Sequence, residues 1–167
     1  SNGQYQEAID SIKLLNESYP NVPLLFNLIG ACYKSLGQLK AAAQMFETAV
    51  GIKPDYAEAL KNLGITLDDL GQLDGAVKCF EKAIIADTNY VDAHYNLAIT
   101  LKKLGLLDAA VKSYENVLAI NPNFAQAHNN LGNVFKSLGK NHAAVDCYEK
   151  AIAINPNFAE AYSNLGN

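Results

Sequence analysis

A repeat of 34 residues constrains this sequence more than any other feature. Glycine recurs at that interval, at Gly3, Gly37, Gly71, Gly105 and Gly139. An alanine lies five residues after each glycine, and Ile, Phe or Tyr lies nine residues after it. The register defines a half repeat, four complete repeats and the first nine positions of another, namely 1–22, 23–56, 57–90, 91–124, 125–158 and 159–167. Because no residue lies outside this register, we expect one domain, a single array over 1–167.

The apolar residues within one repeat, numbered here by positions 1 to 34, follow a helical period. In 91–124, Ala93, Leu97 and Leu101 are spaced by four, as on one buried face of a helix. After Gly105 a second apolar stripe begins and includes Tyr114. The sequence therefore predicts an all-α protein in which each repeat is a helix A and a helix B. Glycine between them is suited to the left-handed conformation that ends helix A.

Polar residues three apart precede several helices A, at Asp55 and Glu58, Asn123 and Gln126, and Asn157 and Glu160. This is the spacing of a capping box, in which the first side chain accepts a hydrogen bond from the first helical turn. We therefore expect the Asp or Asn of each pair to be the N-cap of helix A.

The segment Asp55-Tyr56-Ala57-Glu58-Ala59-Leu60-Lys61-Asn62-Leu63-Gly64, with copies at 123–132 and 157–166, resembles the tetratricopeptide repeat. The resemblance covers the whole chain. It implies a right-handed α–α superhelix of 34-residue units whose helices A line a concave groove with positions 2, 5, 6, 9, 12 and 13. Runs such as 125–133 are similar to the arrays that precede catalytic domains in O-GlcNAc-transferase-type and related bacterial proteins. The family is a scaffold with many partners, so the resemblance implies function only coarsely.

Composition argues against several classes of function. The net charge is −4 and all 13 basic residues are lysine, which does not suit a nucleic-acid surface. No apolar run approaches the roughly 20 residues that cross a bilayer, so we expect no membrane partner. Cys32, Cys79 and Cys147 form an odd set without a C-x-x-C pair, as is typical of thiols in a reducing compartment. We expect a cytoplasmic protein.

No pattern indicates catalysis, a cofactor or a metal site. His94 and His128 share position 4 with Phe, Leu and Tyr in other repeats, which favours packing over metal binding. Glycines are accounted for by turns and helix packing apart from Gly51 and Gly75, and they form no phosphate-binding loop. We therefore expect a non-enzymatic protein without cofactors.

Position 6 carries asparagine in four successive helices A, although asparagine is a poor helix-interior residue. These four residues, the Asn ladder, are Asn62, Asn96, Asn130 and Asn164. Two interpretations stay open: the amides brace neighbouring helices, or each pairs with a peptide group of an extended ligand. The resemblance to the transferase arrays implies the second interpretation.

Other groove positions vary between repeats. Position 5 holds Lys61, Tyr95 and Asn129, position 9 holds Asn133, and position 12 holds Lys102 and Lys136, all candidate peptide contacts. Some chaperone-binding members of the family clamp a carboxylate with Lys at position 5 and Asn at position 9. Here Lys61 is followed by Ile65, so that clamp is absent. Asp68 and Asp69 place anions at the negative end of helix A, and we expect cross-repeat pairs with Lys102 and Lys103.

At groove positions 2 and 6 the first complete repeat holds Leu24 and Leu28, where later repeats hold polar residues, and these leucines are a candidate partner patch. An upstream helix or a partner would cover them. The half repeat 1–22 is a helix B without its helix A, and 159–167 is a helix A without its helix B. We therefore expect weak head-to-tail self-association.

Three functions fit these observations. The first is an interaction scaffold that binds an extended peptide or protein segment in its groove. The second is the substrate-targeting arm of a larger glycosyltransferase or sulfotransferase, and the third is a self-assembling structural module. The partner's identity does not follow from the sequence.

Overall fold

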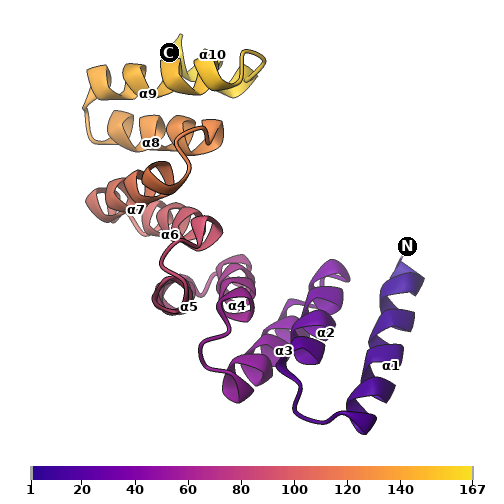
Figure 1. The fold of residues 1–167 in the computed structure, drawn as a ribbon. Coiled ribbons are helices and arrows are strands. Elements are labelled where there is room, and N and C mark those ends of the chain that lie inside the picture. Colours follow the sequence, from indigo (N-terminus) through magenta and orange to yellow (C-terminus); the bar gives the residue numbers. More distant parts are fainter. Residues whose placement is uncertain (1, 167) are drawn as a thin grey trace. The chain divides into compact units, whose positions relative to one another are not determined.

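The computed structural model describes residues 2–166, which contain ten α-helices and no strand (Figure 1). In chain order they are α1 (Asn2–Ser18), α2 (Pro23–Ser35), α3 (Leu39–Ile52), α4 (Ala57–Asp69), α5 (Leu73–Ala86), α6 (Val91–Lys103), α7 (Leu107–Ile120), α8 (Ala125–Ser137), α9 (Asn141–Ile154) and α10 (Ala159–Leu165). The predicted all-α fold of helix pairs is confirmed. From α2 to α9, even-numbered helices are helices A and odd-numbered helices are helices B; α1 is a further helix B and α10 a further helix A.

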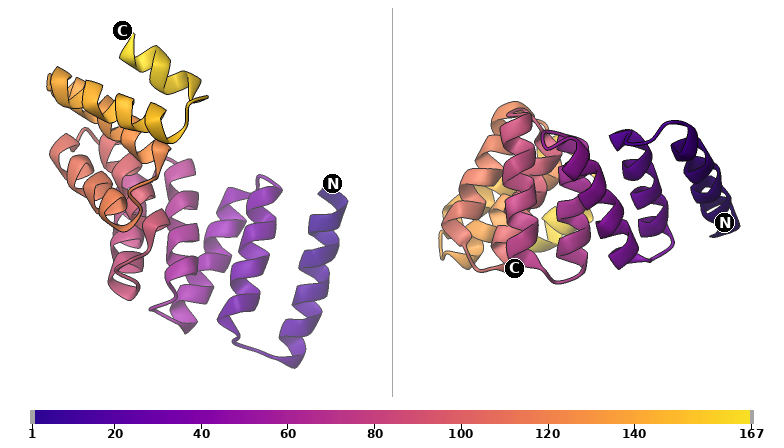
Figure 2. Two further views of the ribbon diagram at one scale, coloured as in Figure 1. Left: turned by 45° about the horizontal axis from the view of Figure 1, so that its top comes forward. Right: turned by 90° about the horizontal axis from the view of Figure 1, so that it is seen from below.

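The helices fall into two compact units, Ser1–Thr88 with α1 to α5 and Asn89–Asn167 with α6 to α10. Within each unit every helix packs against the next one in the chain, as the views in Figure 2 allow the reader to follow. Helices A of adjacent repeats also touch, α2 with α4 and α8 with α10. We call the surface formed by the helices A of one unit its helix-A face. That the array runs without interruption over 1–167 stays a prediction.

The turns between helices A and B are built as the glycines predict. Gly37, Gly71, Gly105 and Gly139 have φ angles between 73° and 76°, in the left-handed region. At the end of α2, the Gly37 N–H donates to the Lys34 carbonyl and the Gln38 N–H to the Tyr33 carbonyl. These bonds satisfy carbonyls that the helix itself leaves unpaired.

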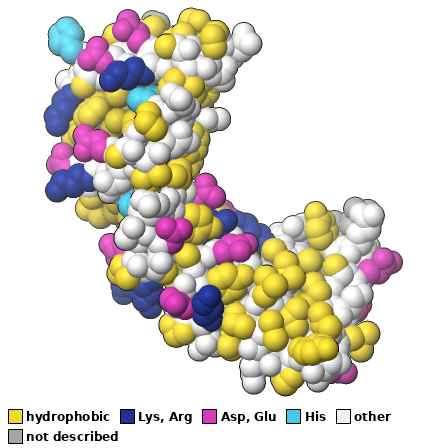
Figure 3. All heavy atoms as spheres, in the orientation of Figure 1, with side chains coloured by type: hydrophobic (Ala, Val, Ile, Leu, Met, Phe, Trp, Pro, Cys, Tyr) yellow, Lys and Arg dark blue, Asp and Glu magenta, His cyan; other side chains and the backbone are white. Residues whose placement is uncertain are grey.

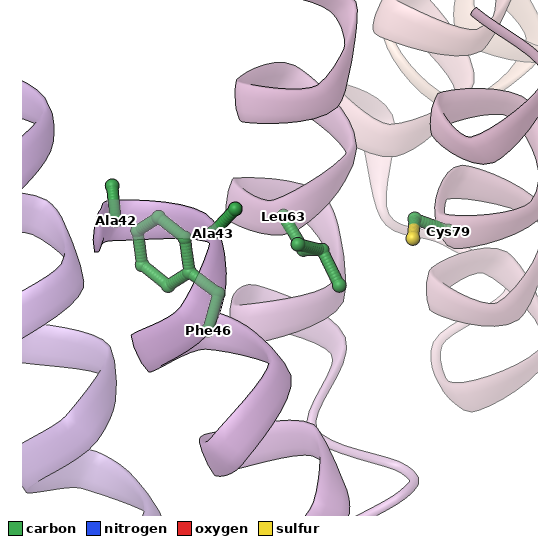
Figure 4. Close-up of a cluster of buried hydrophobic side chains, with 5 residues drawn as sticks. All are labelled: Ala42, Ala43, Phe46, Leu63 and Cys79. Carbon is green, nitrogen blue, oxygen red and sulfur yellow. The ribbon is translucent and has the colours of Figure 1, made fainter. Parts of the chain in front are cut away.

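Close approach of helix A to helix B depends on small residues at position 8. A Cβ on Gly64 would lie 2.6 Å from the ring of Phe80, and one on Gly132 would lie 2.6 Å from Tyr148. The aromatic rings at position 24 fill the space between the paired helices and are at most 2% exposed. Figure 4 shows part of this core, with Phe46 of α3 near Leu63 of α4.

The predicted capping boxes are wrong. Helices α4, α8 and α10 begin at Ala57, Ala125 and Ala159, so their N-cap residues are Tyr56, Phe124 and Phe158, and no side chain caps them. The expected caps Asp55, Asn123 and Asn157 lie one residue too early. Instead, the backbone N–H groups of Asn123 and Asn157 donate to the side chains of Asn121 and Asn155 in tight turns. At one of these cap positions the ring packs on the preceding helix A, since Phe124 stacks on Tyr95.

No helix within residues 2–166 has both the length and the apolar character needed to cross a membrane.

Candidate peptide-binding surface

The Asn ladder is tied to the preceding repeat by hydrogen bonds. Asn62 Nδ2 donates to Asn27 Oδ1 at 3.0 Å, and Asn164 Nδ2 donates to Asn129 Oδ1 at 2.9 Å. Asn130 Nδ2 donates to the Tyr95 hydroxyl at 2.9 Å. In each case the partner occupies position 5 of the repeat before. The amides of Asn62, Asn130 and Asn164 therefore brace neighbouring helices A, which is the first of the two interpretations of the ladder.

The fourth ladder residue differs, because Asn96 Nδ2 donates to the backbone carbonyl of Asp92 in its own helix at 2.7 Å. All four ladder side chains are partly exposed. Asn130 is also hydrogen-bonded to the side chain of Tyr114. The ladder amides therefore lie at the helix-A face with their Nδ2 atoms held by protein partners.

Position 5 contributes a buried asparagine in two repeats, one in each unit. Asn27 is 2% exposed and its Nδ2 donates to Glu58 Oε1 at 3.4 Å; Asn129 is 1% exposed and its Nδ2 donates to Glu160 Oε1 at 2.9 Å. Each also accepts the bond from the ladder asparagine of the next repeat. We call these two triads, Asn27–Glu58–Asn62 and Asn129–Glu160–Asn164, the amide brackets. Their glutamates are the residues expected to complete capping boxes.

Asn129 is therefore not a groove contact, contrary to the prediction from its position. Its amide is wedged between two helices A, and both its oxygen and its nitrogen are already hydrogen-bonded. A ligand would have to break the bracket to reach it. Asn133, also predicted as a contact, is half-buried and accepts a hydrogen bond from the Tyr148 hydroxyl at 2.8 Å.

An aromatic cluster surrounds the predicted contact Tyr95. Its ring stacks on Phe124 with centroids 4.9 Å apart and meets Tyr114 edge-on at 6.0 Å. Desolvation by burial raises the pKa of the Tyr95 and Tyr114 hydroxyls, so both stay protonated at neutral pH. Tyr95 is only half-buried, so the edge of this cluster reaches the helix-A face.

The lysines of the predicted surface are in different environments. Lys61 is half-buried in the first unit. Lys34 Nζ lies 3.2 Å from Asp69 Oδ2, so Asp69 pairs with the preceding repeat, where we had expected a lysine of the following one. Lys102 is half-buried and Lys136 is exposed, and neither forms an ion pair within residues 2–166.

Two pockets open beside these lysines in the second unit. One of about 310 Å³ is lined by Ile99, Lys102, Lys103, Tyr114 and Asn130. The other, of about 270 Å³, is lined by Lys136, Asn141, Ala144, Val145, Tyr148, Asn164 and Leu165. Sequence reasoning treated Tyr114 and Tyr148 only as core residues. The missed signal was the change from Phe46 and Phe80 to tyrosine at that position, which places a hydroxyl where the first unit has none.

The candidate apolar patch lies in the first unit. Leu24 and Leu28 are 50% and 42% exposed. Further large apolar side chains of α1 and of the turn after it are exposed as well: Tyr5, Leu14, Leu15 and Tyr19. Figure 3 shows apolar side chains gathered over α2 and its neighbours. A covering partner for this patch stays a prediction.

The histidines and cysteines occupy structural positions. His94 is buried, and His128 Nε2 lies 2.9 Å from the Pro122 carbonyl oxygen. Cys79 and Cys147 are buried free thiols whose pKa is raised by desolvation. No group of three or more potential metal-binding side chains occurs in the part of the chain that the structure describes.

The chain is similar in fold to solved repeat proteins. A crystal structure of MamA superposes with a TM-score of 0.88 at 26% identity, covering 95% of this chain and 92% of MamA. YrrB, described as a TPR protein with an unusual peptide-binding site, superposes with a TM-score of 0.86 at 22% identity, covering 99% of this chain and 85% of YrrB.

Two curated relatives match shorter segments. Anaphase-promoting complex subunit 3 of Dictyostelium discoideum is 33% identical over 63 residues, and the Protein CTR9 homolog of Arabidopsis thaliana is 38% identical over 64 residues. Each match covers 38% of this chain but only 6% of the relative. The finer similarity to O-GlcNAc-transferase-type arrays stays a prediction.

Family models agree with the register of the sequence. The TPR repeat model matches residues 67–105, 101–139 and 132–167, and the tetratricopeptide repeat model matches 25–56. Together with the helix pairs and the left-handed glycine turns, these matches establish that the chain belongs to the tetratricopeptide repeat family.

Proposed function

We propose that this chain is a non-enzymatic interaction scaffold that binds an extended peptide along its helix-A faces. The observation that carries the proposal is the set of ladder amides, which are fixed in orientation by hydrogen bonds from their Nδ2 atoms and are partly exposed at the helix-A face. A preorganised acceptor binds a peptide N–H without the cost of ordering its own side chain. The peptide-binding site named for YrrB supports the proposal as an analogy.

The spacing of the ladder suits an extended chain. Packed helices lie about 8–10 Å apart, and an extended peptide rises about 3.3 Å per residue. One ladder amide would then meet every third peptide group. Because the contact is with the peptide backbone, the ladder would give affinity that tolerates many sequences, and other groove residues would select among them. We place this partner among cytoplasmic proteins because Cys32, Cys79 and Cys147 are free thiols, as is typical of a reducing compartment.

A backbone-directed test separates this role from bracing. Peptides selected from a random display library on the immobilised chain would be resynthesised with N-methyl groups that remove single peptide N–H donors. We expect affinity to fall when every third amide is methylated and to persist with methylation elsewhere. Asn96→Ala with Asn130→Ala should weaken all selected peptides, whereas Asn116→Ala, on the exposed side of helix B, should not. A double variant that binds as tightly as the parent would leave the ladder with a bracing role alone.

A second candidate function is head-to-tail self-association, favoured by the exposed face of α1. Positions 20, 24 and 27 are at most 3% exposed in every complete repeat. In α1 the same positions are Ala8 and Ile12, which are half-buried, and Leu15, which is 45% exposed. At the other end of the repeat pattern, Tyr162 of α10 is 50% exposed, whereas Leu60 at the same position is 1% exposed. These faces are complementary, since helix A packs on helix B in each repeat.

Self-association through so short a helix would be weak and dependent on concentration. Light scattering over a wide concentration range should show a rising mean mass for the parent. Leu15→Asp should keep the protein monomeric, whereas Ile85→Asp, at an exposed site on α5, should not change the association. A parent that is monomeric at every concentration would contradict this candidate.

A further inference from the structure

The two pockets of the second unit contain the same three residue types at equivalent positions. Each is lined by a lysine at position 12, a tyrosine at position 24 and the ladder asparagine of the next repeat. The sets are Lys102, Tyr114 and Asn130, and Lys136, Tyr148 and Asn164. We call them the Lys–Tyr–Asn pockets. They lie one repeat apart, and each offers a cation and hydrogen-bonding groups around one cavity.

The first unit does not offer this combination. Its position-12 lysine, Lys34, is neutralised by Asp69, and the next repeat has Asp68 in place of lysine. Its position-24 residues are Phe46 and Phe80, which carry no hydroxyl. The units also differ in charge: residues 1–88 contain seven lysines and eleven acidic residues, whereas 89–167 contain six of each.

Charge is also separated along the helices A of the second unit. Lys102, Lys103 and Lys136 lie in the last turn. The acidic residues of these helices, Asp92 and Glu160, lie in the first turn, about 15 Å away at about 1.5 Å per residue. Glu160 is moreover hydrogen-bonded to Asn129. The helix dipole accounts for a cation at this end, but not for the pocket that recurs beside it one repeat later.

We infer that the two Lys–Tyr–Asn pockets bind two carboxylate side chains of an acidic peptide that lies along the helix-A face of the second unit. The lysine ammonium supplies charge, and the second N–H of the ladder asparagine supplies a directed hydrogen bond to a carboxylate oxygen. The tyrosine forms part of the pocket wall. The repeat spacing places the two acidic residues about three residues apart in an extended peptide. The inference rests on the proposed peptide binding and names the chemistry that the second unit selects.

This arrangement differs from the carboxylate clamp of chaperone-binding family members, which uses positions 2, 5, 6 and 9. Position 5 in the second unit holds Tyr95 and the buried Asn129, and position 9 holds Ile99 and the hydrogen-bonded Asn133. The pockets therefore recognise side-chain carboxylates rather than the end of a chain.

The test uses three fluorescent probe peptides of about twelve residues, long enough to span both pockets. The first repeats Glu-Thr-Val and the second repeats Gln-Thr-Val, both with acetylated and amidated ends. The third is the glutamine peptide with a free C-terminal carboxylate. Fluorescence anisotropy with the full chain gives the Kd of each. We expect the glutamate peptide to bind about tenfold more tightly than the glutamine peptide, and the difference to shrink at high salt.

Lysine variants locate the interaction. Lys102→Gln and Lys136→Gln should each weaken the glutamate peptide about fivefold and leave the glutamine peptide unchanged. Lys34→Gln is the matched control, because it removes the same charge at the same repeat position where Asp69 already neutralises it.

The outcomes separate this inference from the proposed function. Equal affinity for the glutamate and glutamine peptides would overturn the carboxylate pockets and leave peptide binding intact. Absence of binding by all three peptides would overturn both. Equal losses from Lys34→Gln and Lys102→Gln would show a general charge effect and also overturn the pockets. Tight binding of the third peptide, matching the glutamate peptide, would assign recognition to a chain end instead.

Discussion

Replacement of Asn129 by alanine should destabilise the second unit without changing its surface. Asn129 is 1% exposed and joins two helices A through hydrogen bonds to Glu160 and Asn164, both at 2.9 Å. Alanine removes both bonds and leaves a small cavity. The two former partners lie at the surface, where water can replace part of what they lose.

The magnitude follows from these contacts. A neutral hydrogen bond contributes about 1 kcal/mol, and the bond to a largely exposed glutamate contributes about the same after solvent screening. Alanine returns about 0.6 kcal/mol through its higher helix propensity. The expected loss in the free energy of unfolding is therefore about 1.5 kcal/mol. For Asn27→Ala the loss should be about 0.5–1 kcal/mol, since the bond to Glu58 is longer, at 3.4 Å.

Urea unfolding followed by circular dichroism measures the total effect, and hydrogen exchange locates it, because repeat arrays can open one unit at a time. Exchange should increase in α8 and α10 for Asn129→Ala, and in α2 and α4 for Asn27→Ala. A double-mutant cycle of Asn129→Ala with Asn164→Ala should give a coupling of about 1 kcal/mol. Asn116→Ala, at an exposed site, is the control. Stability of Asn129→Ala within about 0.3 kcal/mol of the parent would refute the bracket as a stabilising element.

Three further predictions concern packing and titration. Gly64→Ala should lower the free energy of unfolding by about 1 kcal/mol in the same urea assay, since overpacking against Phe80 exceeds the gain in helix propensity. The control is Gly51→Ala, whose Cβ meets no atom of the described chain within 4 Å and which should be neutral or stabilising. Burial raises the folded-state pKa of Tyr114 above its unfolded value of about 10. The stability that the protonated Tyr114 side chain gives the folded protein is therefore intact below pH 10 and is lost as the pH rises further. Between pH 8 and pH 11 the Tm should therefore fall less for Tyr114→Phe than for the parent protein. An equal fall in Tm would contradict the raised pKa of Tyr114. Buried Cys79 and Cys147 should react with a thiol reagent more slowly than the half-buried Cys32, as mass spectrometry of labelled peptides would show.

The repeat register predicted the helix pairs, the glycine turns and the core because each position has nearly the same environment in every repeat. Gly37 and Gly139 have the same φ of 73° although three repeats separate them. Side chains that bridge repeats were harder to predict, since their partner depends on geometry across two helices. Asp69 pairs with Lys34 in the preceding repeat rather than with the following one.

The capping boxes failed for a related reason. A glutamate three residues after a polar residue can complete a capping box in its own helix. The same glutamate can equally accept a hydrogen bond from helix A of the preceding repeat. In the structure, Glu160 accepts a hydrogen bond from Asn129 of the preceding repeat, and Phe158 is the N-cap residue of α10. Spacing along the chain could not separate these two uses of the same side chain.

The amide brackets also explain why polar residues change together between repeats. An asparagine at position 5 has two N–H donors and one acceptor, so it needs an acceptor and a donor from the next repeat, and Glu at position 2 with Asn at position 6 supply them. This set occurs twice, beginning at Asn27 and at Asn129. Where position 5 is Tyr95, its hydroxyl accepts from Asn130 and the next position 2 is Gln126 rather than glutamate. The Nδ2 atom of the asparagine at position 6 therefore has a structural role in Asn62, Asn130 and Asn164, where it bonds the preceding repeat. A peptide contact is to be sought at the Oδ1 atom.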